Sequence, residues 1–244
     1  MKNMIWSVRA KAYEKLEWSK RPGYLQDFVA AGDFQPTDWV LDVGAGTGIV
    51  AHVVAPLVAK VVGIDISLDM LEHARISQMS NEIFEEGEAS KLHFPDAQFD
   101  KVMARMVFHH LVDDGDQAIQ ECYRVLKPGG LMILSEGTPP DHSLKDWYTR
   151  MFALKEQRLT FFEEDLMALM SNGGFSVDRV LTYVSPQVSI GNWLRNSGLP
   201  PERQDRIMQM HFELDEAGRQ HYNMVIADND VLCDFKYITL VGSK

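Results

Sequence analysis

The chain has 244 residues, of which 45% are hydrophobic and 24% are charged, and its formal net charge is −11. This length suits one α/β domain with an elaboration. Nucleic-acid affinity rests largely on lysine and arginine, so the negative charge disfavours a nucleic-acid partner. The two cysteines are isolated, and we expect neither a disulfide framework nor a metal site. No stretch is apolar over the ~18 to 20 residues that a membrane helix needs, so we expect a cytoplasmic protein without a membrane partner.

Residues 38–137 alternate short apolar runs with longer amphipathic ones. This is the pattern of strand–helix units that build a parallel sheet. Thr47 and Ser67 are expected to cap the helices that follow the first two strands, and Asp114 with Gln117 resembles a capping box. The predicted strands are Trp39–Val43, Lys60–Asp65, Glu82–Glu86, Phe99–Val107 and Leu131–Glu136.

The second half of the chain is less regular. A helix is predicted from Trp147 to Gln157, and Thr160 with Glu163 resembles a capping box that opens another helix ending at Asn172. Two strands are predicted at Phe175–Val184 and Val231–Val241. We divide the chain into an N-terminal helical segment (1–36), a core (37–188 and 223–244) and a helical cap inserted before the last strand (189–222).

A glycine-rich turn joins the first predicted strand to its helix in the run VLDVGAGTG, residues 40–48. Glycines let the backbone approach a ligand closely and leave the first amides of the next helix free to bind it. The next strand ends at Asp65, about 20 residues after Gly44, which is the spacing at which a carboxylate accepts hydrogen bonds from ribose hydroxyls. The sequence therefore predicts a nucleoside-binding half.

The spacing of the glycines distinguishes between nucleosides. Dinucleotide-binding proteins use G-x-G-x-x-G/A, whereas Gly44, Gly46 and Gly48 give G-x-G-x-G after an acid, Asp42. A carboxylate at that place suits a cationic amino group better than a pyrophosphate. Here the sequence resembles the class I S-adenosylmethionine-dependent methyltransferases, in particular the small-molecule branch that includes the ubiquinone and menaquinone biosynthesis enzymes.

The resemblance continues in order for about 100 residues, through EGEA (86–89), LHFPD (92–96) and VLKPGGLMI (125–133). It implies an α/β fold: a mostly parallel, seven-stranded Rossmann-like sheet with helices on both faces, an antiparallel last strand and a helical cap insertion. It also implies S-adenosylmethionine as cofactor, S-adenosylhomocysteine as product and a small-molecule methyl acceptor, with a homodimer as one possibility. The family more often has Asp where this chain has Glu88.

The resemblance further implies which residues contact the cofactor. They are Asp42, Gly44, Ala45 and Gly46 at the amino-acid portion, Asp65 at the ribose, Ile66, Met70, Glu88 and Ala89 around the adenine, and Arg105 and Met106 beside the reactive methyl. Related enzymes often close the N-terminal segment over the cofactor, and Tyr13 is the residue of that segment that we expect there.

His109 and His110 follow the fourth strand, where the carboxyl ends of an open sheet build the site. An imidazole with an ordinary pKa of about 6.5 suits a general base, if the acceptor atom has a proton to lose. Either residue is expected to act as base or substrate contact, or both fill space against the next helix. Candidates for a pocket wall in the second half are Trp147, Tyr148, Phe152, Trp193, Met208 and His211, which are also typical of a helix core.

The sequence favours methyl transfer from S-adenosylmethionine to an oxygen, nitrogen or carbon atom of a small molecule. Two alternatives stay open at this point. One is an NAD(P)-dependent oxidoreductase, which is disfavoured by the missing third glycine or alanine. The other is a non-catalytic S-adenosylmethionine-binding protein, because a fold by itself does not prove turnover.

Overall fold

A computed structural model describes residues 15–16, 19, 21–227 and 230–244. In these residues the strands form an eight-stranded sheet in the order β3-β2-β1-β4-β5-β8-β6, and β7 pairs with β8 outside this path. The strands are β1 (Trp39–Val43), β2 (Lys60–Asp65), β3 (Glu82–Glu86), β4 (Phe99–Arg105), β5 (Leu126–Thr138), β6 (Ser176–Ser189), β7 (Val225–Ala227) and β8 (Asp230–Ser243). The Rossmann-like α/β prediction is confirmed, and the short β7 is the strand that it lacked.

The direction of the strands follows from the way in which they are connected. β1 to β5 pair in parallel across helical crossovers. β8 is antiparallel to both β5 and β6, as predicted for the last strand. Parallel strands that are covered on both faces need continuous apolar runs, and four of the five residues of β1 are buried.

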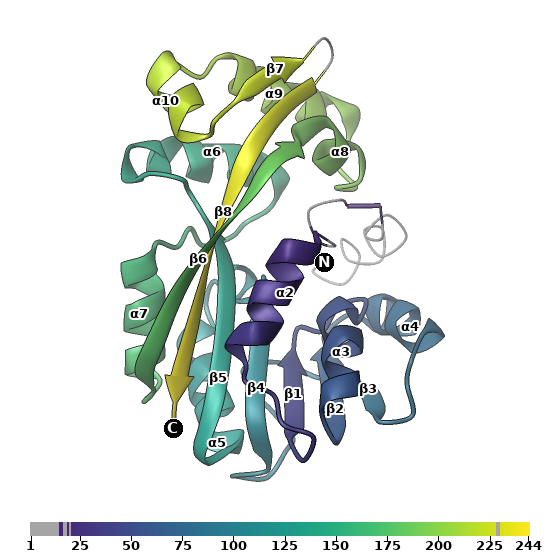
Figure 1. Cartoon of the computed structure of the whole chain (residues 1–244). Helices are drawn as coiled ribbons and strands as arrows, with labels where there is room; N and C mark the ends of the chain where they lie inside the picture. Colours follow the sequence, from purple (N-terminus) through teal and green to yellow (C-terminus); the bar gives the residue numbers. More distant parts are fainter. Residues whose placement is uncertain (1–14, 17–18, 20, 228–229) are drawn as a thin grey trace.

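Helices cover both faces of the sheet (Figure 1). α5 (Gly115–Val125) and α7 (Glu163–Asn172) pack on one face, in a cluster that includes Phe99 and Leu126. α2 (Pro22–Ala31), α3 (Ile49–Val54) and α4 (Leu68–Ile76) pack on the other. This arrangement leaves the carboxyl ends of the parallel strands accessible from one edge of the sheet.

A third cluster of buried side chains forms beyond that edge. β6 and β8 run past the end of β5 into a group of helices at the top of Figure 1. These helices are α6 (Lys145–Lys155), α8 (Ile190–Arg195), α9 (Pro201–Phe212) and α10 (Glu216–His221). Their cluster includes Tyr148, Trp193 and Ile207. The core and this upper cluster therefore meet at the edge where the strands end.

The fourth strand is shorter than predicted. β4 ends at Arg105 rather than Val107, because Met106 has a φ of 60°, in the left-handed region. A non-glycine residue there is strained, and such strain is concentrated at functional sites. The turn is held by hydrogen bonds from the Met106 amide to the Ser135 carbonyl oxygen (2.8 Å) and from the Gly137 amide to Met106 Sδ (3.1 Å). It redirects the chain into the short helix η3 (Phe108–His110).

Three predicted helix caps differ from the structure. α3 begins after Gly48 rather than Thr47, whose buried hydroxyl has no partner among the described residues. Asp114 precedes α5 without a side-chain capping bond. α7 begins after Phe162, with the Phe162 amide donating to Asp165, so Thr160 is not its cap. The Ser67 cap is confirmed, since its hydroxyl accepts a bond from the Met70 amide.

Candidate functional site

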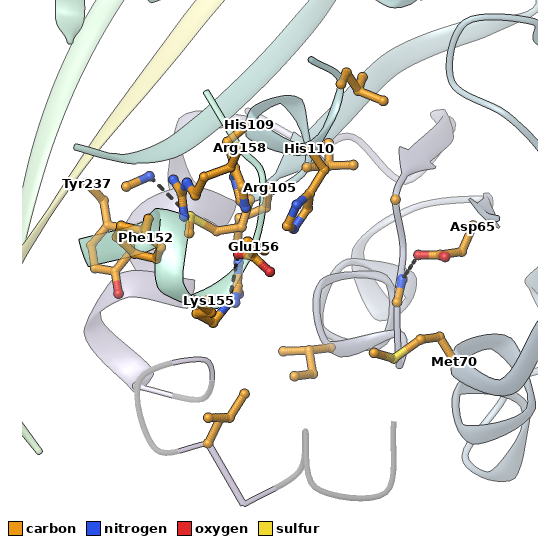
Figure 2. A pocket seen from close by; sticks show the side chains of 18 of the residues that line it. Asp65, Met70, Arg105, His109, His110, Phe152, Lys155, Glu156, Arg158 and Tyr237 are labelled. Carbon is orange, nitrogen blue, oxygen red and sulfur yellow. Dashed lines mark hydrogen bonds and ion pairs between the residues drawn. The ribbon is translucent and has the colours of Figure 1, made fainter. Parts of the chain in front are cut away.

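A cavity of about 450 Å³ lies where the strands end, between the sheet and the upper helices (Figure 2). Most of the predicted site residues line it, although they come from separate parts of the chain. Those that do are Asp42, Gly44, Ala45, Gly46, Asp65, Ile66, Met70, Glu88, Ala89, Arg105, Met106, His109 and His110. Tyr13 lies outside the described residues.

The glycine loop presents backbone to the cavity. Gly44 and Gly46 have φ values of 70° and 55°, which side chains rarely adopt. A Cβ on Gly44 would collide with Val107 Cγ2, whereas a Cβ on Gly46 would meet no atom within 4 Å. Gly44 therefore permits close packing of the loop on the chain after β4. Gly46 leaves an open face against which a ligand can lie.

Asp65 links the two loops that follow β1 and β2. Its Oδ2 accepts a hydrogen bond from the Gly46 amide and its Oδ1 accepts one from the Ser67 amide, both at 2.9 Å. Desolvation raises the pKa of this half-buried carboxyl, and the two amide bonds oppose that shift. Because each carboxylate oxygen can accept a further bond, Asp65 can hold the loop and a ligand hydroxyl together.

Next to Asp65, the cavity has an apolar wall with a carboxylate at its rim. Met70 is buried in α4, and Ile66 is 36% exposed at the end of β2. Glu88 and Ala89 follow β3, with Glu88 exposed and Ala89 half-buried. Figure 2 shows Met70 and Asp65 together, across the open space from His110. An apolar face beside an exposed carboxylate can hold a flat heterocycle that carries an amino group.

Asp42 is a buried carboxyl with an unused oxygen. It is 2% exposed, and among the described residues no group donates a hydrogen bond to its Oδ2. Burial raises its pKa to about 8, and the nearby positive charge of Arg105 opposes that shift. Arg105 donates from Nη2 to the Ser19 carbonyl oxygen at 3.0 Å, and its Cζ lies 4.9 Å from the centre of the Tyr24 ring.

The two predicted histidines have different surroundings. His109 is 3% exposed, and its Nδ1 lies 2.6 Å from Oε2 of Glu136, at the end of β5. Burial raises the pKa of Glu136 to about 7. His110 lies against His109, with ring centres 3.9 Å apart, and burial and then His109 hold its pKa well below the ordinary value. His109 is therefore the histidine that a carboxylate orients.

The opposite wall of the cavity is aromatic. Of the residues proposed for such a wall from the sequence, Tyr148, Phe152, Trp193 and His211 line the cavity. Trp147 and Met208 do not line it but pack in the upper cluster. Tyr222, Phe235 and Tyr237 also line this wall, without having been predicted. The wall suits a flat, largely apolar molecule.

Charged groups lie at the boundary between the two walls, at the end of α6. Lys155 Nζ donates to Glu156 Oε1 at 2.7 Å, and Arg158 Cζ lies 4.1 Å from the centre of the Phe152 ring. Ligand atoms of Glu156, His109 and His110 lie within 4.8 Å of one another. Because Lys155 already neutralises Glu156, and Arg158 adds a second positive charge, a metal cation is disfavoured there.

Comparisons with known proteins identify the core. Residues 41–134 match a family model described as a methyltransferase domain. The chain is 28% identical to the methyltransferase YcgJ of Bacillus subtilis over 214 residues, which cover 84% of each protein. It is 36% identical to the demethylmenaquinone methyltransferase of Symbiobacterium thermophilum over 132 residues, which cover 51% of each. The crystal structure of YcgJ has the same fold, with a TM-score of 0.82, 24% identity and coverage of 92% of this chain and 99% of that one.

The chain belongs to the class I S-adenosylmethionine-dependent methyltransferases. This confirms the family expected from the glycine loop and decides against a nicotinamide-dependent oxidoreductase. The activity is methyl transfer from S-adenosylmethionine, and membership of the family implies that the protein binds this cofactor. In the part of the chain that the structure describes, no helix is long and apolar enough to cross a membrane.

The cavity of this methyltransferase fits the group that the family uses. The open face at Gly46 admits a ligand against the loop. Asp42 lines the same cavity and has an oxygen, Oδ2, without a hydrogen-bond partner among the described residues, as a site for a cationic group requires. Sequence reasoning missed Glu136, Lys155, Glu156 and Arg158. Glu136 had a usable signal, because an acid that ends an apolar strand beside β4 must lie near the histidines that follow β4.

Proposed function

We propose that this methyltransferase transfers its methyl group to a small, largely apolar molecule that is held against the aromatic wall. The observation that carries the proposal is that one cavity is lined both by the glycine loop, with Gly46 and Asp65, and by His109, Phe152 and Trp193. A cofactor bound on the first side would meet an acceptor bound on the second, with His109 at their boundary. Alignment of nucleophile, methyl carbon and sulfur supplies most of the rate enhancement in such a reaction.

The residues predicted for the cofactor are assigned by their places in the cavity. The Gly44–Gly46 backbone and Asp42 would hold the amino-acid portion, with the carboxylate of Asp42 facing the cationic amino group. Asp65 would accept hydrogen bonds from the ribose hydroxyls while it keeps its bond to the Gly46 amide. Bound S-adenosylmethionine supplies a methyl group on a sulfonium, which is a good leaving group.

The other cofactor contacts follow from the apolar wall beside Asp65. Ile66 and Met70 would pack on the faces of the adenine, and Glu88 with the Ala89 backbone would meet its amino edge. Arg105 and Met106 would lie beside the methionine portion, at the strained turn that ends β4. We also propose that the segment before residue 37 closes over the cofactor, since Leu16 lines the cavity. Tyr13 stays a prediction.

His109 and Glu136 form the proton-accepting pair of this proposal. When Glu136 is ionised, it accepts a hydrogen bond from Nδ1–H of His109, so that Nε2 carries the lone pair. An acceptor O–H or N–H can then lose its proton to Nε2, and the resulting imidazolium is stabilised by the carboxylate behind it. His110, whose pKa is held low, would stay neutral and contact the acceptor.

The negative net charge and the aromatic wall support a small-molecule acceptor rather than a nucleic acid. We also propose that residues 189–222 form a cap, which supplies part of this wall through Trp193 and His211. A homodimer stays a prediction, to be checked by sedimentation of the purified chain.

Calorimetric titration with S-adenosylmethionine, S-adenosylhomocysteine and NADH in parallel tests the proposal. We expect micromolar binding of the two adenosyl ligands and none of NADH. An acceptor screen with radiolabelled methyl donor then tests turnover on small aromatic and apolar molecules. Binding of the adenosyl ligands without transfer to any of these would favour the non-catalytic binding protein, and binding of NADH alone would refute the cofactor assignment.

A further inference from the structure

His211 lies in α9, in the aromatic wall of the cavity and remote in sequence from the glycine loop. Its side chain is 2% exposed and lines the cavity. Nδ1 lies 2.8 Å from the carbonyl oxygen of Ile207, one helical turn earlier. Trp147 packs edge-on against the ring, with centres 5.0 Å apart. The ring is therefore held in one orientation from two sides.

The partner of Nδ1 fixes the tautomer of His211. A carbonyl oxygen only accepts hydrogen bonds, so Nδ1 must carry the proton and Nε2 must carry a lone pair. Burial lowers the pKa of His211 to about 4, so the ring stays neutral at physiological pH. Among the described residues, no donor is bonded to Nε2. Nε2 is also not one of the fully enclosed polar atoms without a partner, so a ligand can reach it. Because His211 lines the cavity, this acceptor atom is available to a ligand that binds there.

His109 shows what a different partner would do. Its Nδ1 faces the carboxylate of Glu136, which stabilises a protonated ring, whereas the carbonyl behind His211 does not carry a charge. Both rings can present an Nε2 lone pair to the same cavity. His109 is therefore suited to take a proton, and His211 is suited only to accept a hydrogen bond.

We propose that His211 is a specificity-determining residue, whose Nε2 accepts a hydrogen bond from an O–H or N–H group on the methyl acceptor. This inference rests on the proposed function, and it narrows the substrate class to aromatic molecules that carry a neutral hydrogen-bond donor. A lone pair on a neutral imidazole accepts hydrogen bonds and repels an anion, so this contact favours a neutral donor over a carboxylate or phosphate beside Nε2. Trp193, Tyr222 and Phe235 line the wall that would hold the ring of the acceptor.

Two bicyclic probes of the same shape test this inference on the whole protein. Indole carries an N–H where benzofuran carries an oxygen, so they differ in the one donor that His211 would recognise. Saturation with S-adenosylhomocysteine comes first, followed by titration with each probe in the calorimeter. Benzofuran lacks the donor and would leave Nε2 of His211 without a hydrogen bond. We therefore expect indole to bind about tenfold more tightly than benzofuran.

The variant His211→Phe keeps a flat ring and removes the acceptor atom, so we expect it to bind both probes equally. His221→Phe is the matched control, because His221 is an exposed histidine of the neighbouring α10 that does not line the cavity. It should keep the tenfold preference for indole. Equal binding of the two probes by the unmodified protein would overturn the inference, as would binding of neither probe or a preference that survives in His211→Phe.

Nitrogen-15 NMR of the unmodified protein provides a second readout that does not depend on the folding of a variant. We expect the Nε2 resonance of His211 to have the shift of an unprotonated nitrogen and to move towards that of a hydrogen-bonded one with indole but not with benzofuran. A protonated Nε2, or a resonance that does not respond to indole, would refute the inference. Failure of S-adenosylhomocysteine to bind would instead refute the proposed function, and the response to indole could still be measured without it.

Discussion

The two sides of the cavity are built from different materials. The cofactor side consists of the glycine-loop backbone and of side chains at or after the ends of β1 to β4, all within residues 41–134, which match the methyltransferase domain. The acceptor side consists of aromatic and charged side chains from later elements, such as Phe152, Trp193 and His211. The first side is specified by local spacing, whereas the second depends on how distant segments pack. The difference explains why the cofactor could be inferred before the structure and the acceptor could not.

The largest effect is expected at the boundary between the two sides. His109→Ala removes the proposed base without changing the glycine loop, so turnover should fall by ~10² or more while the affinity for S-adenosylhomocysteine stays the same. The measurement is steady-state methylation of an acceptor found in the screen, together with calorimetry. His93→Ala is the control, because His93 is about half exposed and pairs with Glu85 away from the cavity. Equal loss of turnover and cofactor affinity would assign His109 a packing role.

Asp65→Ala tests the cofactor side. The variant would lack the proposed bond from the carboxylate to the ribose and also the bonds that the carboxylate accepts from the Gly46 and Ser67 amides. We expect binding of S-adenosylhomocysteine to weaken by ~1.5 to 3 kcal/mol, the usual scale for a hydrogen bond to a charged group. Turnover at saturating cofactor should change much less than in His109→Ala. An unchanged affinity would remove Asp65 from the cofactor site and would weaken the contrast between the two sides.

Particular residues show where prediction from sequence succeeds. β1 and β2 begin and end at the predicted residues, because an apolar run that is bounded by turn residues defines a buried strand locally. Asp65 and the glycines were found by spacing, and the structure brings them to one cavity.

Other features depended on contacts that no local pattern encodes. β4 ends early because Met106 is held in a left-handed conformation by Ser135 and Gly137 of the neighbouring strand. Thr47 is of a residue type that often caps helices, but Gly48, in the left-handed conformation, is the residue that precedes α3. Glu136 was missed because its partner, His109, is 27 residues earlier in the chain. The early end of β4 and the His109–Glu136 pair are both decided by β4 and β5 lying side by side.

Glu136→Gln sharpens the difference between a base and a simple contact. Burial raises the pKa of Glu136 to about 7, so in the native protein it is protonated below this pH, and Nε2 of His109 becomes available above it. We expect kcat/KM to rise as the pH passes through about 7. In the variant this rise should be lost, and the value above pH 7 should fall by about tenfold or more. A profile that keeps the same inflection would show that Glu136 does not position the base.

Asp42→Asn is expected to have the smallest effect on activity and a distinct effect on proton binding. Burial raises the pKa of Asp42 to about 8 from an ordinary value of 3.8. Between these two pH values the folded chain holds a proton that the unfolded chain has lost, so this group makes the protein less stable as pH rises through that window, by up to about 1.4 kcal/mol per pH unit. The stability of Asp42→Asn relative to the native protein should therefore grow from pH 4 to pH 8 and stay constant above it, as measured by urea denaturation.

If Asp42 faces the cationic amino group of the cofactor, binding should also lower its pKa and release a proton near neutral pH. Calorimetry in buffers with different heats of ionisation measures the release of that proton. If Asp42→Asn releases the same proton when the cofactor binds, the cationic group lies beside another residue of the cofactor side.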